Sequence, residues 1–215
     1  MVKGEIKAVI LDVDGTLTDD VSWLKLTNGL GGDSEVHQKI FDDFIAGKIT
    51  YPQSRTQLTR LWRSTGNANK KFMSTMFEDW NLRKDAKKVV NYLKQKYIVC
   101  LISGAVDLHV EIVARKLDIT DWYANTELIW DKKGNLVSYN YYKDQAEKKR
   151  EHFYAFAKKF HLSKDNCVAI GNGDSDIALF RELKYGIAIN AEPTAELEKL
   201  AIKKITKLSE LLELL

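Results

Sequence analysis

The stretch Lys7-Ala8-Val9-Ile10-Leu11-Asp12-Val13-Asp14-Gly15-Thr16 decides the fold that we expect for this chain. It begins with an apolar run that contains β-branched residues, and it ends in two aspartates and a glycine. Such a run is typical of a buried parallel strand. Ligands of parallel sheets bind beyond the carboxyl ends of the strands, so the polar residues that follow are the first candidates for chemistry.

Three further apolar runs have the same character, at residues 98–102, 167–170 and 186–189. Between the runs, apolar residues recur at three- and four-residue spacing over residues 85–96, 106–117 and 148–160, which predicts helices. Strands that alternate with helices in this way indicate an α/β fold with a doubly wound parallel sheet.

Two segments interrupt the alternation. Residues 19–81 contain no convincing strand and predict several helices, so we interpret them as a helical cap domain inserted after the first strand. Residues 123–142 contain two β-prone runs around Asp131-Lys132-Lys133-Gly134-Asn135 and predict a small β-hairpin insertion. The α/β core then comprises residues 1–18 and 82–215.

The composition narrows the class of protein. With 215 residues, 45% of them hydrophobic, the chain is long enough for one domain with a modest insertion. A formal charge of +3 gives no reason to expect nucleic acid as a partner. The N-terminus has no signal-peptide pattern and no apolar run reaches membrane-spanning length, so we expect no membrane partner and a cytoplasmic location. Cys100 and Cys167 lie in apolar runs and are interpreted as core residues.

Asp12 and Asp14 alternate along an extended chain, so their carboxylates come close together, while Gly15 lets the backbone turn beneath a ligand. Two carboxylates this close are costly without a cation. Mg²⁺ takes oxygen ligands and pairs with substrate phosphate, so this pattern favours a magnesium and phosphate site. Two other strands end in polar residues that converge on the same edge, at Ser103-Gly104 and Gly171-Asn172-Gly173-Asp174.

Together these motifs resemble the haloacid dehalogenase superfamily. Asp12-Val13-Asp14-Gly15-Thr16-Leu17 is similar to its first motif, Ile102-Ser103-Gly104 to its second, and Gly171-Asn172-Gly173-Asp174-Ser175-Asp176 to its fourth. Lys149 matches the third by its spacing, with Lys143 and Lys148 as alternatives. The helical cap and the run Gly47-Lys48-Ile49-Thr50-Tyr51-Pro52-Gln53-Ser54 are most similar to the phosphoserine phosphatase branch. The resemblance implies a Rossmann-like core.

The resemblance also implies a mechanism. Asp12 would be the nucleophile that forms an aspartyl-phosphate, and Asp14 would protonate the leaving oxygen and then activate water. Ser103, Gly104 and Lys149 would hold the phosphoryl oxygens.

For the metal, the resemblance implies Mg²⁺ on Asp12, the backbone carbonyl of Asp14, and Asn172, with Asp176 at the family's last acidic position. Asn172 stands where the family has an aspartate, and replacing a charge with a dipole should weaken metal binding. Asp174 is an alternative ligand if the loop is shifted.

The sequence predicts a substrate other than that of the branch it resembles. Val21 and Leu58 stand where the branch has a glutamate and an arginine for the ends of phosphoserine. Losing both partners should remove discrimination for that substrate, so we expect another small phosphorylated metabolite. The alternative is that Asp19, Asp20, Arg55 or Arg60 compensates for the two missing contacts.

Other residues carry weaker signals. The aromatic residues Trp23, Tyr51 and Trp62 either line the substrate pocket or, as their spacing favours, form the cap core. The histidines are too scattered to predict a role, and the sequence does not indicate an oligomeric state.

Three activities fit these features. The first is a Mg²⁺-dependent phosphatase. The second is a phosphotransferase that passes the phosphoryl group to an acceptor other than water. The third is a degenerate family member that binds a phosphorylated ligand without turnover, which the departure at Asn172 keeps open.

Overall fold

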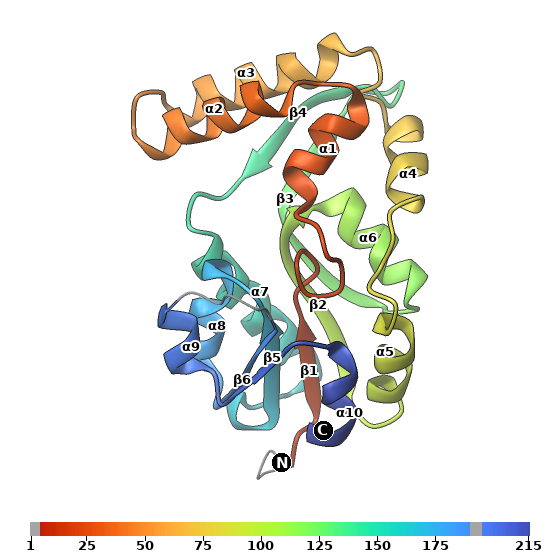
Figure 1. Cartoon of the computed structure of the whole chain (residues 1–215), viewed down its shortest axis with the longest axis vertical. Helices are drawn as coiled ribbons and strands as arrows, with labels where there is room; N and C mark the ends of the chain where they lie inside the picture. The colour runs from red at the N-terminus through yellow and green to blue at the C-terminus, as the bar shows by residue number, and fades with distance from the viewer. Residues whose placement is uncertain (1–4, 190–194) are drawn as a thin grey trace.

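A seven-stranded sheet forms the centre of the molecule, with the strand order β4-β3-β2-β1-β5-β6-β7 (Figure 1). Residues 5–189 and 195–215 are described by the structure, which is a computed structural model. Each neighbouring pair of strands is parallel except β3 and β4, which are antiparallel. The predicted α/β fold with a doubly wound sheet is confirmed.

Four of the strands correspond to the four predicted apolar runs: β1 (Ala8–Leu11), β2 (Ile98–Val106), β5 (Cys167–Gly171) and β6 (Tyr185–Ile189). Three strands were not predicted as part of the sheet: β3 (Asp121–Trp130), β4 (Leu136–Tyr141) and β7 (Lys203–Ile205). The predicted hairpin at 123–142 is the β3–β4 pair. Its first strand also pairs with β2, from Cys100 opposite Asp121 onward, so the hairpin extends the main sheet.

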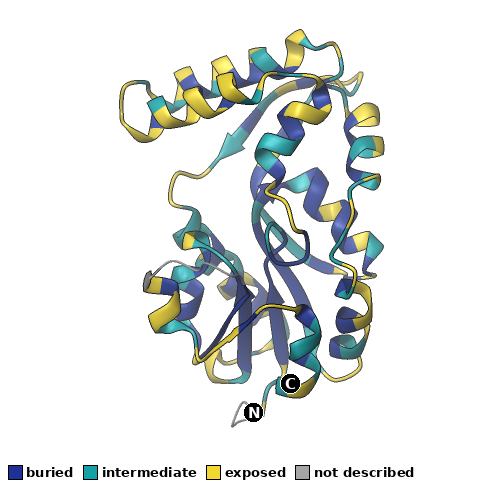
Figure 2. Cartoon of the chain, in the orientation of Figure 1, coloured by how far each residue is buried: buried dark blue, intermediate teal, exposed yellow. Residues whose placement is uncertain are grey.

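Helices cover both faces of the sheet, as the alternation of buried side chains along β1 requires. Val9 and Leu11 face one layer, formed by α5 (Ala86–Lys94), α6 (Asp107–Lys116) and α10 (Leu211–Leu214). Ala8 and Ile10 face the other, formed by α7 (Gln145–Phe160), α8 (Ile177–Glu182) and α9 (Ala195–Leu200). The central strands are accordingly buried along their length (Figure 2).

Residues 22–78 form four helices at the other end of the molecule, α1 (Ser22–Leu30), α2 (Ser34–Ile45), α3 (Tyr51–Ser64) and α4 (Lys70–Glu78). Local sequence sets their ends. The Asp33 side chain accepts from the N–H groups of Glu35 and Val36 and begins α2. Thr50 and Gln53 form a capping box at the start of α3, and Gly31, with φ of +86°, ends α1.

The helical cap packs on the β3–β4 hairpin and on α6. One hydrophobic cluster joins Leu26, Trp62 and Phe77 of the cap to Ile112 of α6 and Leu136 of β4. A backbone hydrogen bond also joins the cap to the hairpin, since Leu136 N of β4 donates to Ala68 O at 2.9 Å. The boundaries after residues 18 and 81 stay a prediction, because the cap shares its core with the sheet domain.

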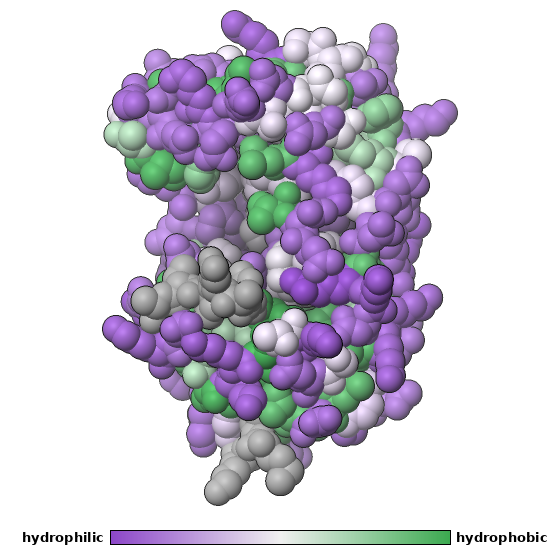
Figure 3. All heavy atoms as spheres, in the orientation of Figure 1, coloured by the Kyte–Doolittle hydropathy of each residue, from purple (hydrophilic) through white to green (hydrophobic). Residues whose placement is uncertain are grey.

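The surface is hollowed between the cap and the core, and hydrophobic side chains on the underside of the cap face the hollow (Figure 3). Cys100 and Cys167 are buried and free, as expected for core residues, and burial raises the pKa of the Cys167 thiol to about 12. Within the described ranges, the structure contains no helix with the length and apolarity needed to cross a membrane.

Candidate active site

Three strand ends meet at the centre of the sheet edge. Asp12 follows β1, Ser103 lies near the end of β2, and Asn172 follows β5. The strands β2 and β5 pair on either side of β1, so the strand order reverses direction here. This is the point where open α/β sheets bind ligands. The structure therefore brings together the polar strand ends that the sequence predicted to converge.

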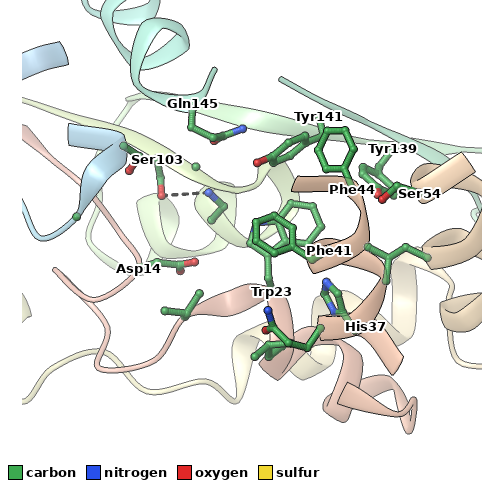
Figure 4. A pocket seen from close by; sticks show the side chains of 18 of the residues that line it. Asp14, Trp23, His37, Phe41, Phe44, Ser54, Ser103, Tyr139, Tyr141 and Gln145 are labelled. Atoms are coloured by element: carbon green, nitrogen blue, oxygen red, sulfur yellow. Dashed lines mark hydrogen bonds between the residues drawn. The ribbon is translucent and has the colours of Figure 1, made fainter. Parts of the chain in front are cut away.

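Strand β2 continues past the predicted end at residue 102 and reaches Val106, and its register against β3 shifts between Ser103 and Val106. Such an irregularity turns a side chain away from its regular direction in the sheet. Ser103 is fully buried, and its Oγ accepts from Ala105 N at 3.3 Å (Figure 4). Ser103 and Gly104 both line the pocket beside Asp12.

Lys149 connects two buried carboxylates. Its Nζ lies 2.9 Å from Asp12 Oδ1 and 2.7 Å from Asp176 Oδ1, and its side chain is 0% exposed. Burial opposes the charge of Lys149, but Asp12 and Asp176 outweigh burial and raise its pKa. Burial raises the pKa of Asp12, and the positive charge of Lys149 opposes that rise.

The two alternative lysines lie elsewhere. Lys148 forms an ion pair with Glu151 at 2.7 Å, and Lys143 Nζ lies 5.7 Å from the centroid of the Phe44 ring. Of the three lysines, Lys149 is the one that contacts Asp12.

Asp14 is held by the first residue of α1. Its Oδ2 accepts from Ser22 N at 2.8 Å and from Ser22 Oγ at 2.6 Å. Burial raises the pKa of Asp14 to about 7, although the two hydrogen bonds from Ser22 oppose the rise. A carboxyl group that titrates near neutral pH is suited to both donating and accepting a proton. Ser22 was not identified from the sequence, since a serine at a helix start is usually only a local cap.

The side-chain amide of Asn172 faces both Asp14 and Asp12. One of its terminal atoms lies 2.8 Å from Asp14 O and 3.2 Å from Asp12 Oδ2. When this atom is the nitrogen, it donates to both oxygens. When it is the oxygen, three oxygens meet without a proton between them. Gly15, with φ of +68°, permits this approach, because a Cβ there would collide with the Asn172 side chain.

This oxygen cluster fits Mg²⁺. Adjacent ligands of an octahedral Mg²⁺ at about 2.1 Å lie roughly 3 Å apart, which matches the separations around the Asn172 amide. The donors are one carboxylate, one amide and one backbone carbonyl. Over the described ranges, no three His, Cys, Asp or Glu side chains cluster closely enough to hold a metal by themselves. A site here needs the backbone and Asn172.

The carboxylate of Asp176 supports the site through its neighbours. Oδ1 contacts Lys149, and Oδ2 accepts from the N–H groups of Asn172 at 3.0 Å and Gly173 at 3.2 Å. Asp176 closes the short helical turn η2 (Asp174–Asp176), whose first residue, Asp174, is exposed and does not line the pocket. Asp176 therefore orients the loop and Lys149.

A cavity of about 360 Å³ runs from Asp12 and Asp14 toward the cap. Its lining includes Trp23 and Tyr51, whereas Trp62 is fully buried in the cap core, so the aromatic residues divide between the two predicted roles. Val21 and Leu58 both line the cavity, at the positions where the resemblance placed substrate contacts.

Two histidines for which the sequence predicted no role lie at the site. His37 lines the cavity, and His109 Nε2 lies 3.8 Å from Asp14 Oδ1. Neither belongs to a motif, and their proximity arises only when α2 and α6 pack against the site.

Comparisons with known proteins agree with this geometry. A family model described as haloacid dehalogenase-like hydrolase matches residues 6–183. The phosphoserine phosphatase of Methanocaldococcus jannaschii is 26% identical over 216 residues, covering 94% of this chain and 96% of that protein. The phosphoserine phosphatase of Archaeoglobus fulgidus is 24% identical over 195 residues, covering 87% of this chain and 54% of that protein.

Solved structures support the fold. A structure of a phospho-aspartyl intermediate analogue of phosphoserine phosphatase superposes with a TM-score of 0.74 at 24% identity, over 99% of this chain and 100% of the other. The family model spans most of the chain and includes each of the strand ends that form the site. The chain therefore belongs to the haloacid dehalogenase-like hydrolases.

Proposed function

We propose that this hydrolase is a Mg²⁺-dependent phosphatase that cleaves a small phosphomonoester through an aspartyl-phosphate on Asp12. The proposal rests on the environment of the Asp12 carboxylate. One of its carboxylate oxygens lies against Lys149 and the other faces the Asn172 amide, and both Asp12 and Asn172 line the pocket.

Asp12 Oδ2, Asp14 O and the amide oxygen of Asn172 would hold Mg²⁺. Bound there, Mg²⁺ would neutralise part of the charge between the Asp12 carboxylate and the phosphate. We assign Asp176 to orienting Lys149 and the loop, because both of its oxygens already have partners.

Asp12 would attack phosphorus in line, so that a bond forms from its oxygen while the bond to the leaving alcohol breaks. Asp14 would give its proton to the leaving oxygen, and then accept one from the water that hydrolyses the aspartyl-phosphate. Ser103 and the Gly104 backbone would hold the phosphoryl oxygens, with Lys149 balancing their charge.

The test uses the purified chain with para-nitrophenyl phosphate and Mg²⁺. We expect free phosphate to appear, and radiolabel from a phosphorylated substrate to be found on Asp12 after acid quench. Asp12→Asn should lose turnover and labelling while still unfolding cooperatively, and Asp174→Asn, at an exposed loop position, should retain turnover and labelling. Substantial turnover by Asp12→Asn would exclude the covalent mechanism.

The same assay distinguishes phosphoryl transfer to water from phosphoryl transfer to an alcohol. Hydrolysis predicts that free phosphate accounts for all of the alcohol released, even when glycerol or ethanol is added. A phosphorylated glycerol product would instead support a phosphotransferase.

A further inference from the structure

The charges of the pocket lie at one end. Among the described residues that line it, Asp12 and Asp14 are the only charged side chains, and both lie at the phosphate end. Figure 4 shows Asp14 and Ser103 at one side of the pocket, and His37, Ser54 and Tyr139 at the other. The volume of about 360 Å³ is at the lower end of the roughly 300–1,000 Å³ of small-molecule sites.

Aromatic side chains form much of the wall between the two ends: Trp23, Phe41, Phe44, Tyr51, Tyr139 and Tyr141. The tyrosine hydroxyls are engaged within the wall. Tyr51 Oη accepts from Tyr141 N at 2.8 Å and donates to Tyr139 O at 3.3 Å. The hydroxyl of Tyr139 lies near Ser54, and that of Tyr141 near Gln145, and each contact opposes the rise in the pKa of the tyrosine that burial causes. The wall therefore presents mostly ring surface to a ligand.

His37 adds a polar ring to the lining, which also includes Gln38, Ser54 and Gln145, and its neighbours indicate its tautomer. Trp62 Nε1 donates to Thr27 Oγ1 at 2.7 Å, so the Thr27 hydroxyl proton is available for His37 Nδ1, which lies 2.7 Å away. The indole N–H of Trp62 can only donate, and Nδ1 of His37 is the one contact of Thr27 Oγ1 in the described structure that can accept the hydroxyl proton, so we assign Nδ1 as the acceptor. The ring proton is then on Nε2. Burial lowers the pKa of His37 to about 4, which keeps the ring neutral at physiological pH.

We infer that the site takes the phosphomonoester of an uncharged, largely apolar alcohol that carries one hydrogen-bond acceptor for the Nε2–H of His37. The inference rests on the proposed phosphatase function and names its substrate class. An anionic group on the alcohol would lie among ring faces and aliphatic side chains such as Leu58 without a partner, which is unfavourable.

The cations nearest to the wall argue against a positively charged substrate. Arg55 Cζ lies 5.4 Å from the centroid of Tyr51, and Lys143 Nζ lies 5.7 Å from that of Phe44. These positive charges already interact with two of the rings and would repel another cation. Neither residue lines the pocket, so neither provides a partner there for a substrate carboxylate.

Matched esters test the inference with Mg²⁺ present. Neohexyl phosphate is the neutral counterpart of phosphocholine, and isobutyl phosphate that of phosphoserine. We expect kcat/KM to be at least about tenfold higher for each neutral ester. Higher kcat/KM for phosphocholine or phosphoserine would overturn the inference while leaving the phosphatase function in place.

Binding to Asp12→Asn, measured by calorimetry with the same esters and Mg²⁺, separates the two proposals. If no ester, including para-nitrophenyl phosphate, is hydrolysed but the neutral esters bind more tightly, the proposed function fails and the substrate class stands. Equal or weaker binding of the neutral esters overturns the substrate class.

His37 is tested with an ester pair that differs by one acceptor, tetrahydrofurfuryl phosphate and cyclopentylmethyl phosphate. The wild type should prefer the ether, and His37→Phe should bring the ratio of kcat/KM values to about one. His37→Gln, which keeps an N–H donor, should retain part of the preference. An unchanged ratio in both variants would overturn the role of His37.

The tautomer of His37 can be measured directly by NMR, because the ring ¹⁵N chemical shifts report which nitrogen carries the proton. We expect the Nε2–H form in the wild type and a mixture in Thr27→Val, which removes the hydroxyl bonded to Nδ1. Thr59→Val is the matched control, since its buried hydroxyl has no partner in the described structure and does not line the pocket. A wild-type Nδ1–H form would overturn the assignment.

Discussion

His109 Nε2 lies 3.8 Å from Asp14 Oδ1, and neither atom has a hydrogen-bond partner within the described part of the chain. His109 packs between Phe77 and Trp80, with a ring-centroid distance of 5.1 Å to each. Burial lowers its pKa to about 3, so the imidazole is neutral and the contact is not an ion pair at neutral pH. Asp14, which we propose as the general acid and base, therefore has the neutral ring of His109 on one side and Ser22 of α1 on the other.

His109→Leu should stabilise the protein, because it removes two buried nitrogens that lack partners. We expect the free energy of unfolding at pH 7 to increase by about 1–3 kcal/mol in urea titrations. A loss of stability would show that the nitrogens are satisfied in solution, for example by water.

The buried histidines should make folding sensitive to acid. His37 and His109 have folded-state pKa values of about 4 and about 3, below the ordinary 6.5. Because the unfolded chain binds protons that the folded chain excludes, stability is fully present above pH 6.5 and is lost as pH falls toward 4. His109→Leu should flatten this loss between pH 6.5 and 4, measured by urea unfolding at several pH values.

The contribution of Asp14 to folding stability changes with pH in the opposite direction over the same pH range. Its folded-state pKa of about 7 exceeds the ordinary 3.8, so its contribution is present below pH 3.8 and lost as pH rises through 7. Asp14→Asn should therefore make the acid loss steeper than in the wild type. An unchanged slope would contradict the raised pKa.

Lys149→Met should be strongly destabilising at neutral pH. The change leaves Asp12 and Asp176 as buried carboxylates without their cation, which typically costs about 3–5 kcal/mol. Adding Asp176→Asn should recover part of the loss, and Lys148→Met, with a lysine that pairs with Glu151 instead, is the control. Equal unfolding free energies for the two single variants would mean that the buried pairs contribute little.

Asn172→Asp should bind Mg²⁺ more tightly and be less stable without it. A carboxylate at this position would face Asp12 Oδ2 and Asp14 O, so it is repelled in the absence of a cation and adds charge to the site when one binds. Melting temperature against Mg²⁺ concentration measures both effects. Asp174→Asn should leave the curve unchanged, and a shift there would instead favour Asp174 as a ligand.

The parallel core was predictable from the sequence because its strands are buried on both faces and appear as apolar runs. Strand β3 was harder to identify as part of the sheet. Only its first half pairs with β2, and the second half runs on as a hairpin beside the cap. The three-residue strand β7 contains two exposed lysines and one buried isoleucine, which is too short for any periodicity.

The residues of the candidate site also differ in how far the sequence predicts their positions. Asp12, Asp14 and Asn172 belong to loops that follow strands directly, so the position of each strand end predicts their place. Lys149 required the phase of α7, which the sequence left open by a residue or more. His37 and Ser22 reach the site only through the packing of the cap helices, a long-range arrangement that local patterns do not encode.

The hydroxyl of Tyr51 fastens helix α3 to the edge of the central sheet through Tyr139 and Tyr141. Strand β4 is hydrogen-bonded to β3, and β3 to β2, which carries Ser103. Hydrogen bonds thus link α3, through β4 and β3, to the strand that carries Ser103. A cap that moved as a whole away from the sheet would have to break the hydrogen bonds of Tyr51, so we expect small molecules to pass by movement of individual side chains such as Phe41, which lines the pocket and is exposed.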